Sequence, residues 1–226
     1  MSGFHPKLEY LPTEFPVFPL TGALLLPGGK LPLNIFEPRY LAMIQDALAA
    51  GRCFGMVQPD RRLAKGDNGP GLYRVGCLGR IGSFSETEDG RYLITLAGVM
   101  RYSIVEEIAG ARGYRRVRAA LAGFTADLHL PRPGLPFARA QLLDALRRYF
   151  AHAGVEANWD AISALPDAAL VVSLCMACPF SPEEKQALLE APDDAARASA
   201  LLALLEINAF DPPSDEDDNN QHPKAS

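Results

Sequence analysis

The stretch FPVFPLTGALLLPGGKLPLNIFEPRYLAMIQDAL, residues 15–48, decides how this chain is organised. Its first half consists of short apolar runs separated by Pro and Gly, which is typical of strands and extended segments joined by sharp turns. After Glu37 and Pro38 the apolar residues recur at helical spacing, at Tyr40, Leu41, Ile44 and Leu48. Pro is tolerated in the first turn of a helix. We therefore predict a strand that runs straight into a helix, with Glu37 and Arg39 at the junction as a structural ion pair or as contacts to the start of the helix.

The whole composition is that of a globular protein with an acidic end. Of 226 residues 48% are hydrophobic and 22% are charged, and the net charge is −5. Five acids and one lysine fall in residues 211–226, so the rest of the chain is close to neutral. This balance gives no global positive field of the kind that attracts nucleic acid. We expect residues 211–226 to form a disordered acidic tail.

The sequence also indicates the compartment. The first residues lack a basic start followed by an apolar core, so we expect no signal peptide. The longest apolar run, residues 168–180, is shorter than the roughly 20 residues of a membrane span. Four cysteines in a chain of this size do not form a disulfide framework. We predict a cytoplasmic, reduced protein that does not enter a membrane.

Two regions of different character follow from the order of the elements. Short strand patterns over 53–58, 73–87, 91–100, 102–108 and 114–124 are joined by tight turns, including Asp89-Gly90. With the helix after Pro38 inserted among them, they predict a small antiparallel barrel over 1–124. Beyond about residue 125 the period is helical, which predicts a helical bundle over 125–210. Within it, Ser181-Pro182-Glu183-Glu184 is a capping-box pattern that predicts the start of a helix, and Asp193 or Asp194 can cap the last helix. The fold class is therefore α+β.

Several longer motifs resemble one known family. These are LPLNIFEPRY at 31–40, FGMV at 54–57, VGCLGRI at 75–81, GRYLITLAGV at 90–99 and CPFSPEEKQALLE at 178–190. Together they resemble the N-terminal, substrate-binding domain of Lon protease, in a stand-alone form. The resemblance implies a pseudo-barrel similar to the PUA fold followed by a helical bundle. It also implies that Glu37, Arg39 and Tyr40 are a signature of the fold.

The sequence does not supply the chemistry of an enzyme. The phosphate-binding pattern GxxxxGK[ST] is absent, and the resemblance brings no proteolytic Ser–Lys pair. Cys175 and Cys178 lie near the end of an apolar helix pattern, where a redox or zinc site is not expected, so we interpret them as core residues. The glycines at 76, 79 and 82 are better explained by close strand packing than by a phosphate cradle. We expect no catalytic set, cofactor or metal.

Two binding functions remain open. The first is binding of unfolded or partner polypeptides in an apolar groove where barrel and bundle meet, for which we expect exposed contacts at Leu25, Pro27, Leu31 and Leu33. The second is RNA binding, because Arg112, Tyr114, Arg116 and Arg118 alternate and would share one strand face. A small-ligand enzyme is a third hypothesis, for which the sequence offers no residues. The partner's identity and the oligomeric state are left open.

Overall fold

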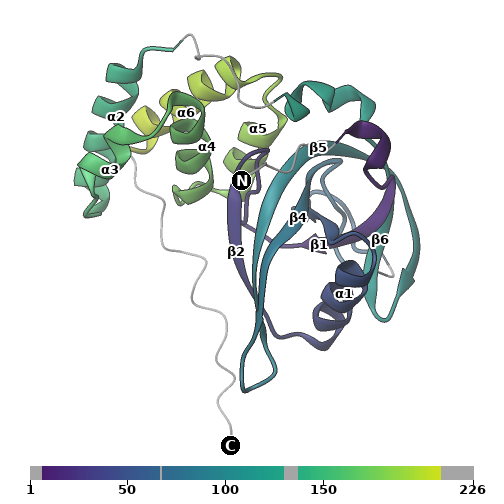
Figure 1. The fold of residues 1–226 in the computed structure, drawn as a ribbon. Coiled ribbons are helices and arrows are strands. Elements are labelled where there is room, and N and C mark those ends of the chain that lie inside the picture. Colours follow the sequence, from purple (N-terminus) through teal and green to yellow (C-terminus); the bar gives the residue numbers. More distant parts are fainter. Residues whose placement is uncertain (1–6, 67, 130–136, 210–226) are drawn as a thin grey trace, which may run out of the picture.

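The computed structural model describes residues 7–66, 68–129 and 137–209 (Figure 1). The predicted acidic tail therefore lies outside the described residues. The strands are β1 (Glu14–Pro19), β2 (Lys30–Ile35), β3 (Cys53–Val57), β4 (Val75–Glu86), β5 (Tyr92–Ala111) and β6 (Tyr114–Ala120). The α-helices are α1 (Pro38–Ala49), α2 (Arg139–Ala153), α3 (Trp159–Ala164), α4 (Asp167–Ala177), α5 (Pro182–Glu190) and α6 (Asp194–Asn208), and the 3-10 helices are η1 (Leu8–Tyr10) and η2 (Ala122–Leu128). None of the helices in these ranges has the length and hydrophobicity to cross a bilayer.

The strands form a single mixed sheet in the order β2-β5-β4-β3-β1-β6. β6 pairs with β5 as well as with β1, so five of the strands form a closed ring of hydrogen-bonded neighbours. The prediction of an all-antiparallel sheet is wrong at one place, since β1 pairs with β3 in parallel. The chain between them contains β2 and α1, which is long enough for the crossover that a parallel pair requires.

The two strands predicted at 91–100 and 102–108 are one long strand, β5. Its register against β4 shifts between Leu78 and Gly79 and again between Ile81 and Ser83. Gly76 and Gly79 make room for neighbours, because a Cβ at either position would overlap the side chain of Tyr102 or Leu96. The structural explanation predicted for these two glycines is therefore confirmed.

Apolar side chains cover both faces of the sheet. β3 is buried along its whole length, with Phe54 and Met56 in one hydrophobic cluster and Cys53 and Val57 in the other. The first cluster continues through α1 and into α2, α4, α5 and α6. The second lies around Tyr102 and is covered at one end by Leu11 and by Phe124 and Leu128 of η2. The helices thus share one hydrophobic core with the sheet.

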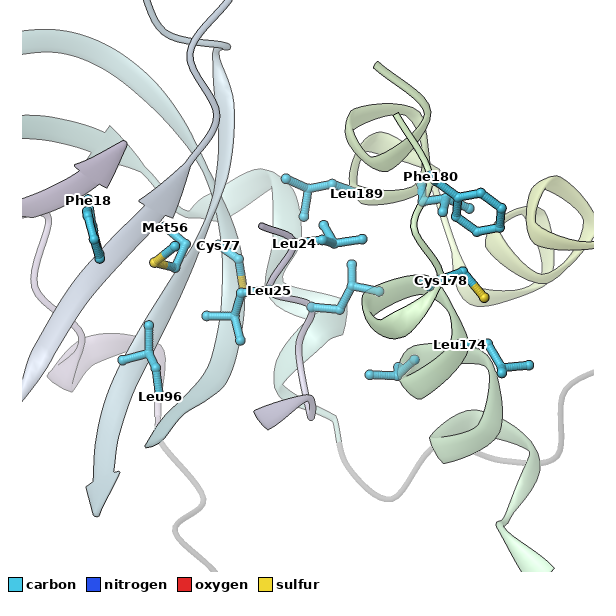
Figure 2. Close-up of a cluster of buried hydrophobic side chains, with 14 of the residues drawn as sticks. Phe18, Leu24, Leu25, Met56, Cys77, Leu96, Leu174, Cys178, Phe180 and Leu189 are labelled. Carbon is cyan, nitrogen blue, oxygen red and sulfur yellow. The ribbon is translucent and has the colours of Figure 1, made fainter. Parts of the chain in front are cut away.

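The segment between β1 and β2 joins the sheet to the helices. Leu24, Leu25 and Leu26 are all buried, and Figure 2 shows Leu24 and Leu25 between the strands and the helical part. Gly28 N–H donates to Gly98 O at 3.0 Å, and Gly98 N–H donates to Gly29 O at 2.9 Å, which fixes the end of this segment to β5. The loop is therefore part of the core.

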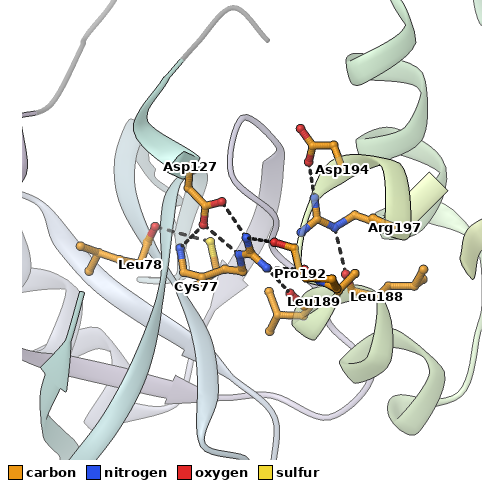
Figure 3. Close-up of polar contacts among 10 residues, drawn as sticks. Cys77, Leu78, Asp127, Leu188, Leu189, Pro192, Asp194 and Arg197 are labelled. Carbon is orange, nitrogen blue, oxygen red and sulfur yellow. Dashed lines mark hydrogen bonds and ion pairs between the residues drawn. The ribbon is translucent and has the colours of Figure 1, made fainter. Parts of the chain in front are cut away.

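A buried ion pair reinforces this junction (Figure 3). Arg101 on β5 donates to both carboxylate oxygens of Asp127 in η2 at 2.9 Å, and the two side chains are only 5% and 4% exposed. The same guanidinium donates to Ala191 O at 2.5 Å and to Leu189 O at 3.3 Å, at the end of α5. One side chain therefore ties the sheet, η2 and the helical part together.

The helix boundaries follow the predicted signals. α1 begins at Pro38, and Glu37 pairs with Arg39 at 2.8 Å instead of capping the helix. Ser181 and Glu184 form the predicted capping box at the start of α5. Asp193 caps α6 by accepting from Ala196 N–H at 2.8 Å. These ends are determined locally, which is why the sequence alone could predict them.

Replacing Gly98 by Ala should destabilise the protein, because the added Cβ would overlap the backbone carbonyl of Leu26 in the buried junction. Forced overpacking of this kind costs about 1–3 kcal/mol. The matched control is Gly82→Ala, whose Cβ would lie 3.6 Å from Thr95 O and meet no clash. Urea unfolding of both variants measures the difference, and equal free energies of unfolding would contradict this account.

The buried and exposed ion pairs should differ strongly in their contribution to stability. Asp127→Ala leaves the Arg101 guanidinium buried without its carboxylate, which we expect to lower the free energy of unfolding by about 3–5 kcal/mol. Glu37→Ala removes the partner of Arg39, where both side chains are about half exposed, and should cost no more than about 1 kcal/mol. Chemical denaturation checks both values. Similar losses in the two variants would mean that Arg101 is not the tie that the structure indicates.

Candidate functional site

A surface groove of about 460 Å³ crosses three strands at the end of the sheet that lies away from α2–α6. The ladder register aligns its residues in rows, so that Leu33 on β2 is opposite Ile94 on β5 and Ile94 is opposite Phe84 on β4. Asn34 and Leu93 belong to the adjacent row. The lining residues are Pro32, Leu33, Asn34, Ser83, Phe84, Ser85, Leu93, Ile94 and Thr95.

The groove has no charged lining residue and exposes apolar surface. Leu93 is 46% exposed and Phe84 is 42% exposed, both large values for apolar side chains in strands. Asn34, Ser83, Ser85 and Thr95 add amide and hydroxyl groups. Phe36, which follows β2, is also exposed and lies 5.9 Å from the Arg91 guanidinium. Such a surface offers apolar contact with a few hydrogen bonds and suits an uncharged ligand.

A tight turn brings β4 and β5 together beside the groove. Thr87 N–H donates to Arg91 O at 2.9 Å, and Gly90 N–H donates to Thr87 O at the same distance. Gly90 has φ of 79°, a conformation that glycine adopts without strain. Asp89 pairs with Arg91 at 2.8 Å across the turn. The Asp89-Gly90 signal therefore predicted the hairpin that places Phe84 next to Ile94.

The expected exposure of the predicted polypeptide contacts is wrong for two of the four. Leu25 is 1% exposed and Pro27 is buried, because the segment between β1 and β2 fills the space between sheet and helices. Leu31 and Leu33 are half-buried on β2, and Leu33 lines the groove. Sequence reasoning missed Phe84 and Leu93. Their position in strands predicted them as ordinary sheet residues. The register puts Leu93 in the row of Asn34 and Ser85 and Phe84 in the row of Leu33 and Ile94, so the two side chains project from opposite faces of the sheet. Leu93 therefore shares its face with Pro32, Asn34, Ser83, Ser85 and Thr95, while Phe84 packs against Tyr92.

The junction between sheet and helices is tightly packed where the structure describes it. Besides the leucines of the connecting segment, a Cβ on Gly29 would overlap the sulfur of Met176 on α4. Gln58 donates to Pro182 O at 2.8 Å, and Lys185 Nζ donates to Gly22 O at 2.7 Å. Burial lowers the pKa of Lys185. The groove described above therefore lies at the other end of β2 from the junction where we expected one.

The predicted basic face does not form as expected. Arg112 lies in the turn before β6 with φ of 49°, and its guanidinium pairs with Asp46 on α1 at 2.8 Å. Tyr114 is only 6% exposed, and its hydroxyl donates to the other oxygen of Asp46 at 2.7 Å. Arg116 is half-buried. Arg118 donates to Glu14 at 2.8 Å and also pairs with Glu106. The correction has a physical cause, since Arg112 lies before β6 begins and α1 packs against β6 beside Tyr114. Carboxylates of α1, β1 and β5 pair with Arg112 and Arg118.

A second hollow, of about 350 Å³, lies between α1 and the β5–β6 turn. Arg39 and Arg115 both line it. Each of them is paired with a carboxylate of its own, Arg39 with Glu37 and Arg115 with Glu107. Positive and negative charges are therefore balanced around this hollow, so it does not favour an anionic ligand.

The cysteines are core residues. Cys175 and Cys178 are buried, and burial raises the pKa of each thiol to about 12. Cys178 is the residue that ends α4, the helix pole that does not favour a thiolate. Within the described ranges, no three or more His, Cys, Asp or Glu side chains gather in a way that could hold a metal ion.

Comparison with known proteins identifies relatives of most of the chain. A family model described as the substrate-binding domain of ATP-dependent protease La (Lon) matches residues 14–206. The chain is 26% identical over 215 residues to Lon protease 2 of Myxococcus xanthus, covering 87% of this chain and 24% of that protein. It is 28% identical over 98 residues to the Lon protease of Anaeromyxobacter dehalogenans, covering 43% of this chain and 12% of that protein. The chain therefore spans about a quarter or less of the length of these relatives.

Two solved structures share the fold. A Lon N-terminal domain protein from Xanthomonas campestris has a TM-score of 0.58 at 24% identity, covering 85% of this chain and 98% of that one. The N-terminal domain of Lon protease from the Mycobacterium avium complex has a TM-score of 0.57 at 18% identity, covering 88% of this chain and 100% of that one. These likenesses support the mixed arrangement of a six-stranded sheet with several helices.

The contact between Tyr114 and Asp46 should give the stability a specific pH dependence. The hydrogen bond from Tyr114 lowers the pKa of Asp46 below its ordinary value of 3.8. Its contribution is thus present above that value and is lost as the pH falls through the lower, folded-state pKa. We expect Tyr114→Phe to destabilise the protein more at about pH 6 than at about pH 2.5. Urea unfolding at both pH values measures this. Tyr10→Phe, at an exposed tyrosine, is the control, and a pH-independent loss in Tyr114→Phe would contradict the assignment.

Proposed function

The chain belongs to the family of substrate-binding domains of ATP-dependent protease La (Lon), and we propose that it is a non-catalytic module that binds unfolded polypeptide. The observation that carries this proposal is the uncharged groove over β2, β5 and β4, where Leu93 is exposed on the same face as Pro32, Asn34 and Thr95. An apolar side chain exposed in an uncharged groove points to a ligand that covers it.

An unfolded polypeptide fits this groove better than a folded partner or a small charged molecule. Unfolded chains expose apolar side chains and unpaired backbone groups together. Leu93 and Pro32 supply apolar contact, while Asn34, Ser83 and Ser85 supply hydrogen-bonding groups on the same face of the sheet. Because the lining has no charged residue, it does not select for charged residues in the bound polypeptide. Recognition would therefore depend on the apolar side chains of that polypeptide. This is the breadth of choice that a substrate-binding module needs.

The biological setting of the module is also part of the proposal. The relatives carry this region as a minor share of much longer proteases, which supports a role as an adaptor or regulator in proteolysis. We place this role in the cytoplasm. For the scaffold we propose the PUA-like pseudo-barrel, and the ring of paired strands β5-β4-β3-β1-β6 supports it.

The first test measures binding of a permanently unfolded, cysteine-blocked polypeptide labelled with fluorescein. We expect its anisotropy to rise on titration with this protein at both low and high salt, because apolar contacts are not screened as charges are. Leu93→Ser should weaken binding by about fivefold or more. Burial of a half-exposed apolar side chain contributes roughly 1 kcal/mol, which corresponds to such a factor.

Val105→Ser is the matched control, because Val105 is also an apolar residue of β5 and is 59% exposed, but does not line the groove. It should bind like the parent. Unchanged binding in Leu93→Ser would show that the groove is not the site. A labelled single-stranded RNA serves as the parallel probe. Salt-sensitive binding of that RNA, without binding of the polypeptide, would replace this proposal with the RNA hypothesis.

A further inference from the structure

The edge of the sheet beside the groove is open. β2 is the terminal strand of the order β2-β5-β4-β3-β1-β6, and β5 is its one pairing partner among the described residues. Figure 1 shows β2 at the margin of the sheet, running along the outer side of β5. The outer edge of such a strand presents backbone N–H and C=O groups that another extended chain can pair with.

The register shows which backbone groups face outward. Gly98 N–H donates to Gly29 O, so Gly29 faces β5. Orientation alternates along an antiparallel ladder, so residues 31, 33 and 35 also face β5, while Lys30, Pro32 and Asn34 face away from it. The outward position of Pro32 is consistent with this alternation, because proline has no N–H and would remove a hydrogen bond to β5 if it faced inward. The free edge therefore offers two donors, at Lys30 and Asn34, and three carbonyl acceptors.

The outward-facing residues of β2 also line the groove. Pro32 and Asn34 belong to both the edge and the groove, and Asn34 is in the same cross-strand row as Leu93. A strand added beside β2 would place every second side chain on the groove face, next to these residues. Edge and groove together therefore form one continuous surface for backbone pairing and side-chain contact.

We propose that the polypeptide bound by this module is an extended, uncharged segment that pairs through its backbone with the free edge of β2. This deepens the proposed function and rests on it. The chemistry of the occupant follows from the lining, since none of the nine groove residues is charged and a charged side chain seated there would lose hydration without a partner. Backbone pairing explains how one site accepts many sequences, because every residue except proline carries the same donor and acceptor.

The test uses proline at position 34, with Pro32 as the precedent in the same strand. Asn34→Pro removes an outward N–H and places the proline ring where the incoming chain must pair, while the ladder to β5 is kept. Asn34→Ala removes the side chain and keeps the N–H. We expect Asn34→Pro to weaken binding of the labelled unfolded polypeptide at least tenfold and Asn34→Ala to weaken it less than threefold. Melting temperatures of the two variants should agree within about 3 °C.

A second measurement leaves the protein unchanged and so does not depend on how the variants fold. Its probes are two fluorescein-labelled, end-blocked octapeptides of alternating leucine and serine, one of which is N-methylated at alternate residues. Loss of at least tenfold in affinity on methylation is expected, because methylation removes the donors and keeps the side chains. Equal affinity of the two peptides would overturn backbone pairing.

The outcomes separate this inference from the proposed function. If Leu93→Ser weakens polypeptide binding but Asn34→Pro binds as well as Asn34→Ala, the module uses the groove and not the edge, and the inference falls while the function stands. If neither peptide nor polypeptide binds the parent, both fall. If the parent forms a dimer in sedimentation that Asn34→Pro abolishes, the occupant of the edge is a second copy, and the inference is again overturned.

Discussion

Burial of the Leu24–Leu26 segment between the sheet and the helices is the constraint on which the rest of this structure depends. One face of a sheet cannot bury three consecutive side chains, because neighbouring residues point to opposite faces. The three leucines are buried instead where the sheet and the helices meet. Gly98 leaves the space that the carbonyl of Leu26 occupies, and Gly29 allows Met176 to approach from α4. The sheet and the helices therefore form a continuous core.

Directional contacts then fix how the helices sit on the sheet. Arg101 fixes the positions of the ends of both η2 and α5, because it donates to Asp127 and to the carbonyls of Leu189 and Ala191 at the end of α5. Gln186 on α5 adds a hydrogen bond of 3.1 Å to Val75 O at the start of β4. Apolar packing supplies most of the driving force for this arrangement. Other orientations of the helices would be costly, since they would leave these buried polar groups unpaired.

Sequence reasoning succeeded where structure is determined locally. The Pro38 helix start, the Ser181 capping box and the Asp89-Gly90 turn each depend on neighbours within a few residues. Sequence reasoning failed where the structure depends on contacts between residues that are far apart in the sequence. The parallel β1–β3 pair cannot be inferred from either strand alone, and the loop containing Leu25 was expected at the surface because most loops lie there. Tyr114 was likewise predicted to contact RNA, but it is a buried hydrogen-bond partner of Asp46, because α1 packs against β6.

The groove illustrates the same limit, because it combines residues 32–34, 83–85 and 93–95 through the register of three strands. Its edge also shows how an exposed strand can be tolerated. An open, uncharged edge favours aggregation, and proteins commonly protect such edges with proline or charge. In β2 both devices occur, since Lys30 is exposed and Pro32 occupies an outward position, where it removes a donor without weakening the ladder to β5. Two donors, at Lys30 and Asn34, and three carbonyl acceptors stay on this edge. In the binding mode that we propose, these groups would pair with the bound chain on either side of Pro32.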